Sequence, residues 1–172
     1  TRRCSVSRPT FSKNAFCDNL NLQEVVFDGE IIDDEAFSNT GIKSFKLSNN
    51  TTRIGSYAFQ YCRSLTEFEI DIHESNLSEI GQNAFQETSL NEIKIPAKIK
   101  VIKKFTFNGC NKLKEVVFSN ESELTSIETH SFSGNLSLEK INIPKSISKL
   151  SYKAFINTPS LNQIMNESNG NF

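Results

Sequence analysis

The sequence predicts a repeat solenoid of about seven copies, each 21–26 residues long, in which parallel strands stack on one another. One observation is an anchor phenylalanine that recurs along the chain, at Phe16, Phe37, Phe59, Phe85, Phe107, Phe132 and Phe155. Another is an alternating apolar segment after each anchor, which is typical of a strand with one buried face. The composition agrees, because 14 Phe in a chain that is only 37% hydrophobic indicate one interior position that is filled repeatedly.

The segment before each anchor carries an apolar residue five positions earlier, as Ile54 precedes Phe59, and usually an alanine directly before the anchor. This spacing of four to five residues predicts one or two turns of α-helix, or a short 3-10 segment, on the side opposite the strands. The apolar residues at this position are Phe11, Ile32, Ile54, Ile80, Ile102, Ile127 and Leu150.

The strand segments begin at a leucine or isoleucine five or six residues after the anchor. Each continues as an alternating apolar pair: Val25/Phe27, Phe45/Leu47, Phe68/Ile70, Ile93/Ile95, Val116/Phe118 and Ile141/Ile143. One copy is too small to bury these side chains, so the copies must stack around a shared core, with neighbouring strands about 4.8 Å apart. The additional residues at 73–78 and 120–125 fall between strand and anchor segments and are expected to form loops.

Two segments, IGSYAFQYCRSLTEFEI at 54–70 and VIKKFTFNGCNKLKEVVF at 101–118, resemble the BspA-like class of leucine-rich repeats. The resemblance covers residues 11–165, with an N-terminal extension or cap at residues 1–10 and a C-terminal tail at 166–172. It implies a curved, right-handed leucine-rich-repeat solenoid, with the parallel sheet on the concave face and the short turns on the convex face. It also implies a cell-surface or secreted protein of bacteria or parasitic protists, with adhesion to host or neighbouring cells as the proposed purpose.

Outward-facing strand residues become columns when the copies stack, and one column has three glutamates on consecutive copies, about 5 Å apart. A neighbouring column places Glu69 between Lys46 and Lys94, which suits ion pairing. We predict that this face binds a protein partner that carries basic groups, although an ordinary solvated sheet face is the alternative. The candidate binding residues are Glu67, Glu69, Asp71, Glu92, Lys94 and Glu115.

The cysteines indicate structural roles. Cys62 and Cys110 both stand three residues after an anchor, where other copies have Thr or Asn, so a small side chain that hydrogen bonds to backbone is expected there. They lie two copies apart, roughly 10 Å, which exceeds the ~7 Å limit between the Cα atoms of a disulfide, and we expect buried free thiols. Cys4 and Cys17 either form a disulfide that seals the N-terminal end or remain two unpaired thiols.

N-x-[ST] sequons occur at six asparagines: Asn49, Asn50, Asn76, Asn120, Asn135 and Asn166. Asn76 and Asn120 are the best candidates for glycosylation, because they lie in the longer loops. Asn135 takes the position that Cys62 holds in its own copy, and we expect it to be buried.

Charge and motifs exclude several classes of function. A net charge of −1 and a pI near 6.1 argue against general binding to nucleic acid or to anionic membranes. No apolar run approaches the ~20 residues of a membrane-spanning helix, and no catalytic signature occurs, so we expect no membrane insertion by this segment, no enzyme activity, no cofactor and no metal. We predict an adhesion or protein-interaction module. The alternatives are an intracellular scaffold and, less favoured, a glycan-binding module or a hydrolase.

Overall fold

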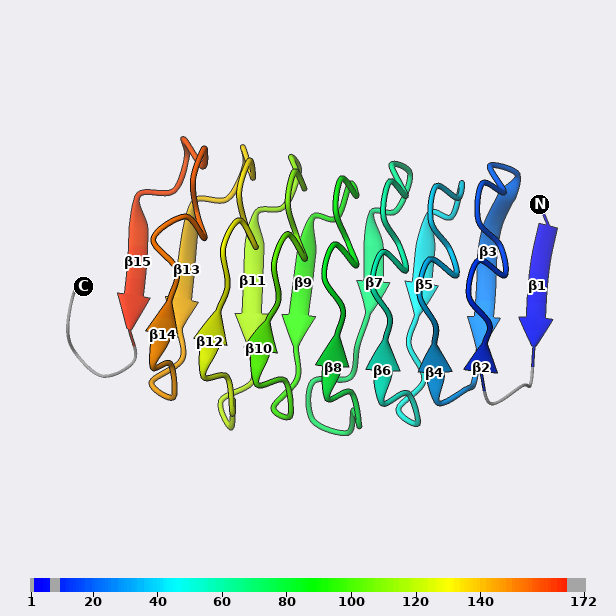
Figure 1. The fold of residues 1–172 in the computed structure, drawn as a ribbon, viewed down its shortest axis with the longest axis horizontal. Helices are drawn as coiled ribbons and strands as arrows, with labels where there is room; N and C mark the ends of the chain where they lie inside the picture. The colour runs from blue at the N-terminus through cyan, green and yellow to red at the C-terminus, as the bar shows by residue number, and fades with distance from the viewer. Residues whose placement is uncertain (1, 7–9, 167–172) are drawn as a thin grey trace.

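The computed structural model describes residues 2–6 and 10–166, and side chains from 10 to 164. The chain coils as a β-solenoid of about seven turns, and each turn, here called a rung, contributes one longer and one two-residue strand (Figure 1). The longer strands are β1 (Arg2–Val6), β3 (Leu22–Phe27), β5 (Ser44–Lys46), β7 (Glu67–Glu69), β9 (Glu92–Ile95), β11 (Glu115–Phe118), β13 (Lys140–Ile143) and β15 (Gln163–Asn166). They lie side by side and, as predicted, pair in parallel, in three groups: β1-β3-β5-β7, β9-β11 and β13-β15.

A second row of parallel strands, which the sequence pattern did not predict, lies on the side of the solenoid opposite the longer strands and runs in the opposite direction (Figure 1). Its members are β2 (Thr10–Phe11), β4 (Ile31–Ile32), β6 (Arg53–Ile54), β8 (Glu79–Ile80), β10 (Val101–Ile102), β12 (Ser126–Ile127) and β14 (Lys149–Leu150). Each contains the apolar residue five positions before the anchor, so that residue belongs to a strand and not to a helix.

The prediction of helical or 3-10 turns around the anchors is wrong. Residues two positions before and after the anchor have left-handed backbone, as Tyr57 (φ 61°) and Tyr61 (φ 60°) do around Phe59; the exception is Lys153 before Phe155. The N–H of Phe59 donates to the carbonyl of Ala84 on the next rung at 2.8 Å, whereas the N–H of Gln60 turns back to Tyr57 at 3.1 Å. In a helix the N–H groups after the first turn bond to carbonyls of the same segment. Because alternate N–H groups bond to the next rung instead, the segment adds another inter-rung ladder.

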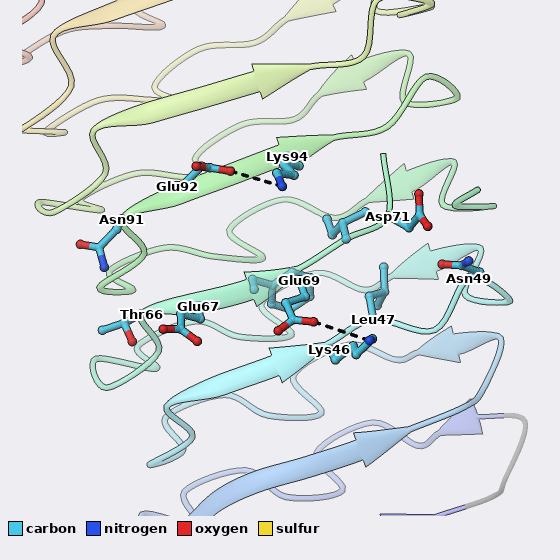
Figure 2. A pocket seen from close by; sticks show the side chains of 12 residues that line it. Lys46, Leu47, Asn49, Thr66, Glu67, Glu69, Asp71, Asn91, Glu92 and Lys94 are labelled. Atoms are coloured by element: carbon cyan, nitrogen blue, oxygen red, sulfur yellow. Dashed lines mark ion pairs between the residues drawn. The ribbon is translucent and has the colours of Figure 1, made fainter. Parts of the chain in front are cut away.

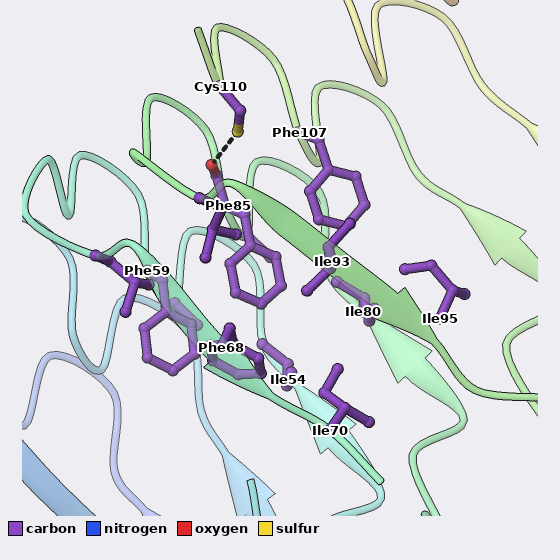
Figure 3. Packing of buried hydrophobic residues seen from close by; sticks show 14 of the residues in the cluster. Ile54, Phe59, Phe68, Ile70, Ile80, Phe85, Ile93, Ile95, Phe107 and Cys110 are labelled. Carbon is purple, nitrogen blue, oxygen red and sulfur yellow. Dashed lines mark hydrogen bonds between the residues drawn. The ribbon is translucent and has the colours of Figure 1, made fainter. Parts of the chain in front are cut away.

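The core is a column of stacked phenylalanine rings, as the composition predicted. The rings of Phe59 and Phe85 lie nearly parallel, with centroids 5.4 Å apart and an interplanar angle of 4° (Figure 3). Successive anchors from Phe16 to Phe155 repeat this stacking at 5.2 to 5.4 Å between centroids. Strand residues complete the core, as Phe68 does by meeting Phe59 edge-on at 5.1 Å. The ring spacing follows the spacing of the rungs, which explains why one residue type fills every turn.

The two predicted loops lie between a longer and a shorter strand, at residues 73–78 and 120–125. Each loop sends one leucine, Leu77 or Leu124, completely into the core. The solenoid therefore accommodates the longer copies without interrupting its interior.

Residues 2–6 of the expected N-terminal extension form β1, which adds a strand beside β3. Asn166, the first residue of the expected tail, ends β15, while residues 1, 7–9 and 167–172 lie outside the described residues. The division into a cap, a repeat domain and a tail stays a prediction. Within the described part of the chain, no helix is long and apolar enough to cross a bilayer.

Candidate functional site

The candidate site lies on the outward side of the longer strands, which we call the strand face. Strand alternation positions its residues: in β7, Phe68 is buried while Glu67 and Glu69 on either side of it are exposed. Burying the apolar residues of each rung therefore places the intervening charged residues on the strand face.

The structure brings the three column glutamates onto neighbouring rungs. Glu115 of β11 lies directly opposite Glu92 of β9. On the other side, the N–H of Asn91 donates to the carbonyl of Thr66 at 3.4 Å, which places the start of β9 beside the start of β7 and therefore beside Glu67. Like charges on facing strand positions are mildly destabilising, so the fold itself gains nothing from this arrangement.

A shallow depression crosses β5, β7 and β9 on the strand face (Figure 2). Of the six candidate residues, five line it: Glu67, Glu69, Asp71, Glu92 and Lys94. Glu115 is outside the depression, one rung beyond Glu92. The rim of the depression also includes residues outside the predicted columns, namely Leu47, Asn49, Thr66 and Asn91. Leu47 is a buried position of the alternating pattern, whereas Asn49, Thr66 and Asn91 lie beyond the strand ends, where that pattern does not apply.

Two ion pairs lie in the depression, and only one of them follows the predicted arrangement. Lys46 Nζ lies 3.7 Å from Glu69 Oε2, as the columns suggested. Lys94 turns instead to Glu92, two residues earlier in its own strand, at 3.7 Å. The Lys46 and Glu69 side chains are 82% and 65% exposed, so their pairing contributes little to stability.

Two column glutamates, Glu67 and Glu115, take no part in an ion pair with any described residue. Glu92 pairs with one lysine, Lys94, through one of its two carboxylate oxygens. The strand face therefore presents carboxylates that a cationic group from outside can neutralise.

Asp71, at the edge of the depression, stabilises a turn of the backbone. Its Oδ1 accepts hydrogen bonds from the N–H groups of His73 and Glu74, both at 3.0 Å, and so fixes the turn after β7. These backbone bonds, that of Glu74 foremost, hold the pKa of the Asp71 carboxyl below its usual range. The carboxylate is therefore ionised at neutral pH, but part of its hydrogen-bonding capacity is already used.

A second depression adjoins the first, over β3 and β5. The two share Lys46, Leu47, Asn49 and Glu69, so they form one continuous hollow from β3 to β9. Val26 lines the second depression and is 41% exposed, which gives this end of the hollow an apolar patch.

Cys62 and Cys110 are buried free thiols, as predicted. Burial raises the pKa of each thiol from 9.0 to about 11. Cys17 is half-buried, but the side chain of Cys4 is outside the described residues, so their disulfide stays a prediction. Where the structure describes side chains, no group of three or more His, Cys, Asp or Glu residues is arranged to hold a metal ion.

The sequons differ in exposure. Asn76 and Asn120 are exposed in the loops, as expected of acceptors, and their glycosylation stays a prediction. Asn135 is completely buried, as predicted, and neither polar atom of its side chain has a hydrogen-bond partner.

The BspA type leucine rich repeat family model matches residues 30–162 in six copies. Among solved structures, the chain is similar to the leucine rich repeat protein TpLRR of T. pallidum, with a TM-score of 0.71 and 24% identity. That match covers 81% of this chain and 64% of the T. pallidum chain, so this chain spans less than two thirds of that protein. At an identity of 24%, the likeness shows the fold alone.

Weaker likenesses exist to the pneumococcal vaccine antigen PcpA, with 16% identity, a TM-score of 0.43 and coverage of 95% of this chain and 61% of that one. A leucine rich cell surface protein of Faecalibacterium prausnitzii matches with 16% identity, a TM-score of 0.32 and coverage of 96% and 78%. No curated protein sequence matches the chain. With the family model covering most of its length, the chain belongs to the BspA type leucine rich repeat family.

Proposed function

We propose that this solenoid is a non-enzymatic binding module whose strand face docks a protein partner that carries basic groups. The observation that carries the proposal is the set of glutamates on neighbouring rungs, of which Glu67 and Glu115 have no ion pair among the described residues. Membership of a leucine-rich-repeat family supports it, because such solenoids use extended sheet faces to bind proteins. In the proposal, the strand face is the concave face of a right-handed solenoid.

The proposed setting is the cell surface or the secreted fraction, with adhesion to host or neighbouring cells as the purpose. The family resemblance supports this setting, and so do the exposed sequons at Asn76 and Asn120. Charged and extended faces favour fast, electrostatically steered encounters with a partner of opposite charge.

Charge reversal on the strand face tests the binding role. The triple variant Glu67→Lys, Glu92→Lys, Glu115→Lys is compared with a control that reverses the exposed carboxylates Glu30, Glu74 and Glu121 away from the strand face. The probe is a fluorescent lysine-rich peptide, and its Kd is measured by anisotropy at low and high ionic strength. We expect the strand-face triple to weaken binding by tenfold or more, which is about 1.4 kcal/mol, with a thermal midpoint near that of the wild type.

The control triple changes the net charge by the same amount and is expected to retain most of the binding. Equal weakening by both triples would reduce the effect to net charge and contradict a site on the strand face. Unchanged binding in the strand-face triple would remove these glutamates from the proposal.

The proposed setting has its own test, the intact non-reduced mass of the protein from its native source, followed by peptide mapping. A Cys4–Cys17 crosslink, or glycan mass on Asn76 or Asn120, would support the secretory route. An unmodified mass with four free thiols would favour an intracellular scaffold instead, and partners would then be sought inside the cell.

A further inference from the structure

The exposed sequons with described side chains all lie along one edge of the solenoid, where a longer strand ends and the chain turns toward a shorter one. Asn49 and Asn50 follow β5, Asn76 follows β7, and Asn120 follows β11 (lower edge in Figure 1). Asn49 differs from the other three, because it lines both depressions of the strand face. A modification of Asn49 would therefore act on the binding surface itself.

The backbone around Asn49 is held firmly while its side chain remains exposed at the rim. The carbonyl of Asn49 accepts the N–H of Asn76 on the next rung at 3.1 Å. The threonine of its sequon, Thr51, is buried and donates its hydroxyl hydrogen to the carbonyl of Gly29 at 2.8 Å. In Figure 2 the Asn49 side chain lies near Asp71, at the end of the depression where Lys46 and Leu47 also stand.

Both amides of the pair face a carboxylate, Asn49 that of Asp71 and Asn50 that of Asp28. The Asn50 amide nitrogen, which is the atom that would carry a glycan, donates to Asp28 Oδ1 at 3.4 Å. Ser48 donates to the same oxygen at 2.7 Å, so this polar cluster lies on the β3 side of the turn. Asn50 lines only the depression over β3 and β5.

We propose that Asn49 is an N-glycan acceptor whose sugar chain covers the depression over β5, β7 and β9 and blocks the approach of a basic partner. This inference rests on the proposed function, both for the secretory route and for the role of the strand face. A glycan is bulky, whereas the three strands span only about 10 Å at a spacing of ~4.8 Å. Glycosylation of Asn49 thus yields a closed form of the binding surface, and its absence yields an open one.

The donor is an oligosaccharide carried on a lipid pyrophosphate. The Asn49 Nδ2 atom forms a bond to the anomeric carbon of the sugar, and the bond between that carbon and the pyrophosphate oxygen breaks. The lipid pyrophosphate leaves with the electron pair of the broken bond, and the amide nitrogen loses one proton.

The test uses the full chain, secreted from a eukaryotic host that performs N-glycosylation. In the variant Asn50→Gln, Asn49 is the remaining acceptor of the pair, and in Asn49→Gln the remaining acceptor is Asn50. Both variants retain the sequons at Asn76 and Asn120. Lysines are labelled with an amine-reactive polyethylene glycol and quantified by peptide mapping. Lys94, which lines the depression over β5, β7 and β9 but not the one over β3 and β5, reports on the depression, and Lys140 on β13 is the reference on the same face.

We expect glycan on Asn49 in the Asn50→Gln variant and labelling of Lys94, relative to Lys140, that is several-fold lower than in Asn49→Gln. Absence of glycan at Asn49, or equal Lys94 labelling in the two variants, would overturn the inference. Equal thermal midpoints of the two variants establish that both fold, and Asn49→Ser replaces Asn49→Gln if they differ. Failure of the proposed function would appear separately, as an unglycosylated protein whose strand-face charge reversal leaves peptide binding unchanged.

Discussion

Cys110 donates its thiol hydrogen to the carbonyl oxygen of Phe85, one rung earlier, at 3.1 Å (Figure 3). Cys62 repeats the contact with Phe37 at 3.0 Å. Where threonine takes the same position, as Thr88 does, the hydroxyl donates to the anchor of its own rung at 3.0 Å. In these rungs the residue three positions after the anchor therefore satisfies a buried backbone carbonyl beside the phenylalanine column, and the chemistry of this position yields two predictions.

The first prediction concerns alkaline pH. The folded pKa of about 11 for Cys62 and Cys110 exceeds the ordinary value of 9.0, so the folded protein retains both protons more tightly than the unfolded chain does. This contribution to stability is fully present below pH 9 and is lost as the pH rises through 11. In the double variant Cys62→Thr, Cys110→Thr, we expect the free energy of unfolding to fall less over this range than in the wild type. Urea denaturation at a series of pH values, under reducing conditions, measures it, and equal losses would contradict the burial of protonated thiols.

The second prediction concerns Asn135, whose buried amide has no hydrogen-bond partner. Asn135→Thr places at this position a residue that other rungs use, with a hydroxyl able to reach the carbonyl of Phe132 as Thr88 reaches Phe85. Because an unsatisfied buried polar group costs about 1–3 kcal/mol, we expect the variant to raise the free energy of unfolding by roughly 1 kcal/mol or more. The control is Asn142→Thr on the exposed strand face, and a destabilised Asn135→Thr variant would show that the position requires the amide.

The third prediction concerns the stacked rings. Phe85→Ala removes the ring between Phe59 and Phe107, whose centroids each lie 5.4 Å from that of Phe85. We expect a loss of about 3–5 kcal/mol in the free energy of unfolding, measured by urea denaturation. Tyr152→Ala is the matched control, because its ring is 88% exposed, and its effect should stay within about 0.5 kcal/mol. Similar effects of the two substitutions would contradict a continuous aromatic core.

The sequence predicted the features that depend on period alone. The spacing of the anchors predicted the column of stacked rings. Strand alternation predicted which residues face outward, as the facing positions of Glu92 and Glu115 illustrate. These features could be predicted because one repeated contact is reproduced in every rung. The burial of Asn135 followed from the same argument, since the interior rungs bury Thr40, Cys62, Thr88 and Cys110 at the same position.

Features set by local backbone geometry were missed. The spacing of apolar residues around Phe107 suits a helix, but Phe105 (φ 58°) and Gly109 (φ 70°) alternate in handedness with their neighbours. A signal was present, because residues two positions from the anchors are frequently Asn, Asp or Gly, which tolerate left-handed backbone. β1 was missed because RRCSV lacks the leucine and the alternating apolar pair.

The side-chain contacts within the candidate site could not be predicted from the sequence either. The column positions allow Lys94 to pair with Glu69 or with Glu92, and the structure shows the pair with Glu92. The turn that Asp71 fixes depends on backbone N–H groups at 73 and 74, which a column argument does not consider.

In our proposal a basic partner docks on the strand face. Zero-length carbodiimide crosslinking of the lysine-rich peptide to the wild-type protein, with the joined carboxylates located by peptide mapping, tests this docking directly. We expect crosslinks concentrated at Glu67, Glu92 and Glu115, which lie on neighbouring rungs and include the two column glutamates without an ion pair among the described residues. Crosslinks at the exposed carboxylates Glu30, Glu74 and Glu121 in equal yield would contradict it.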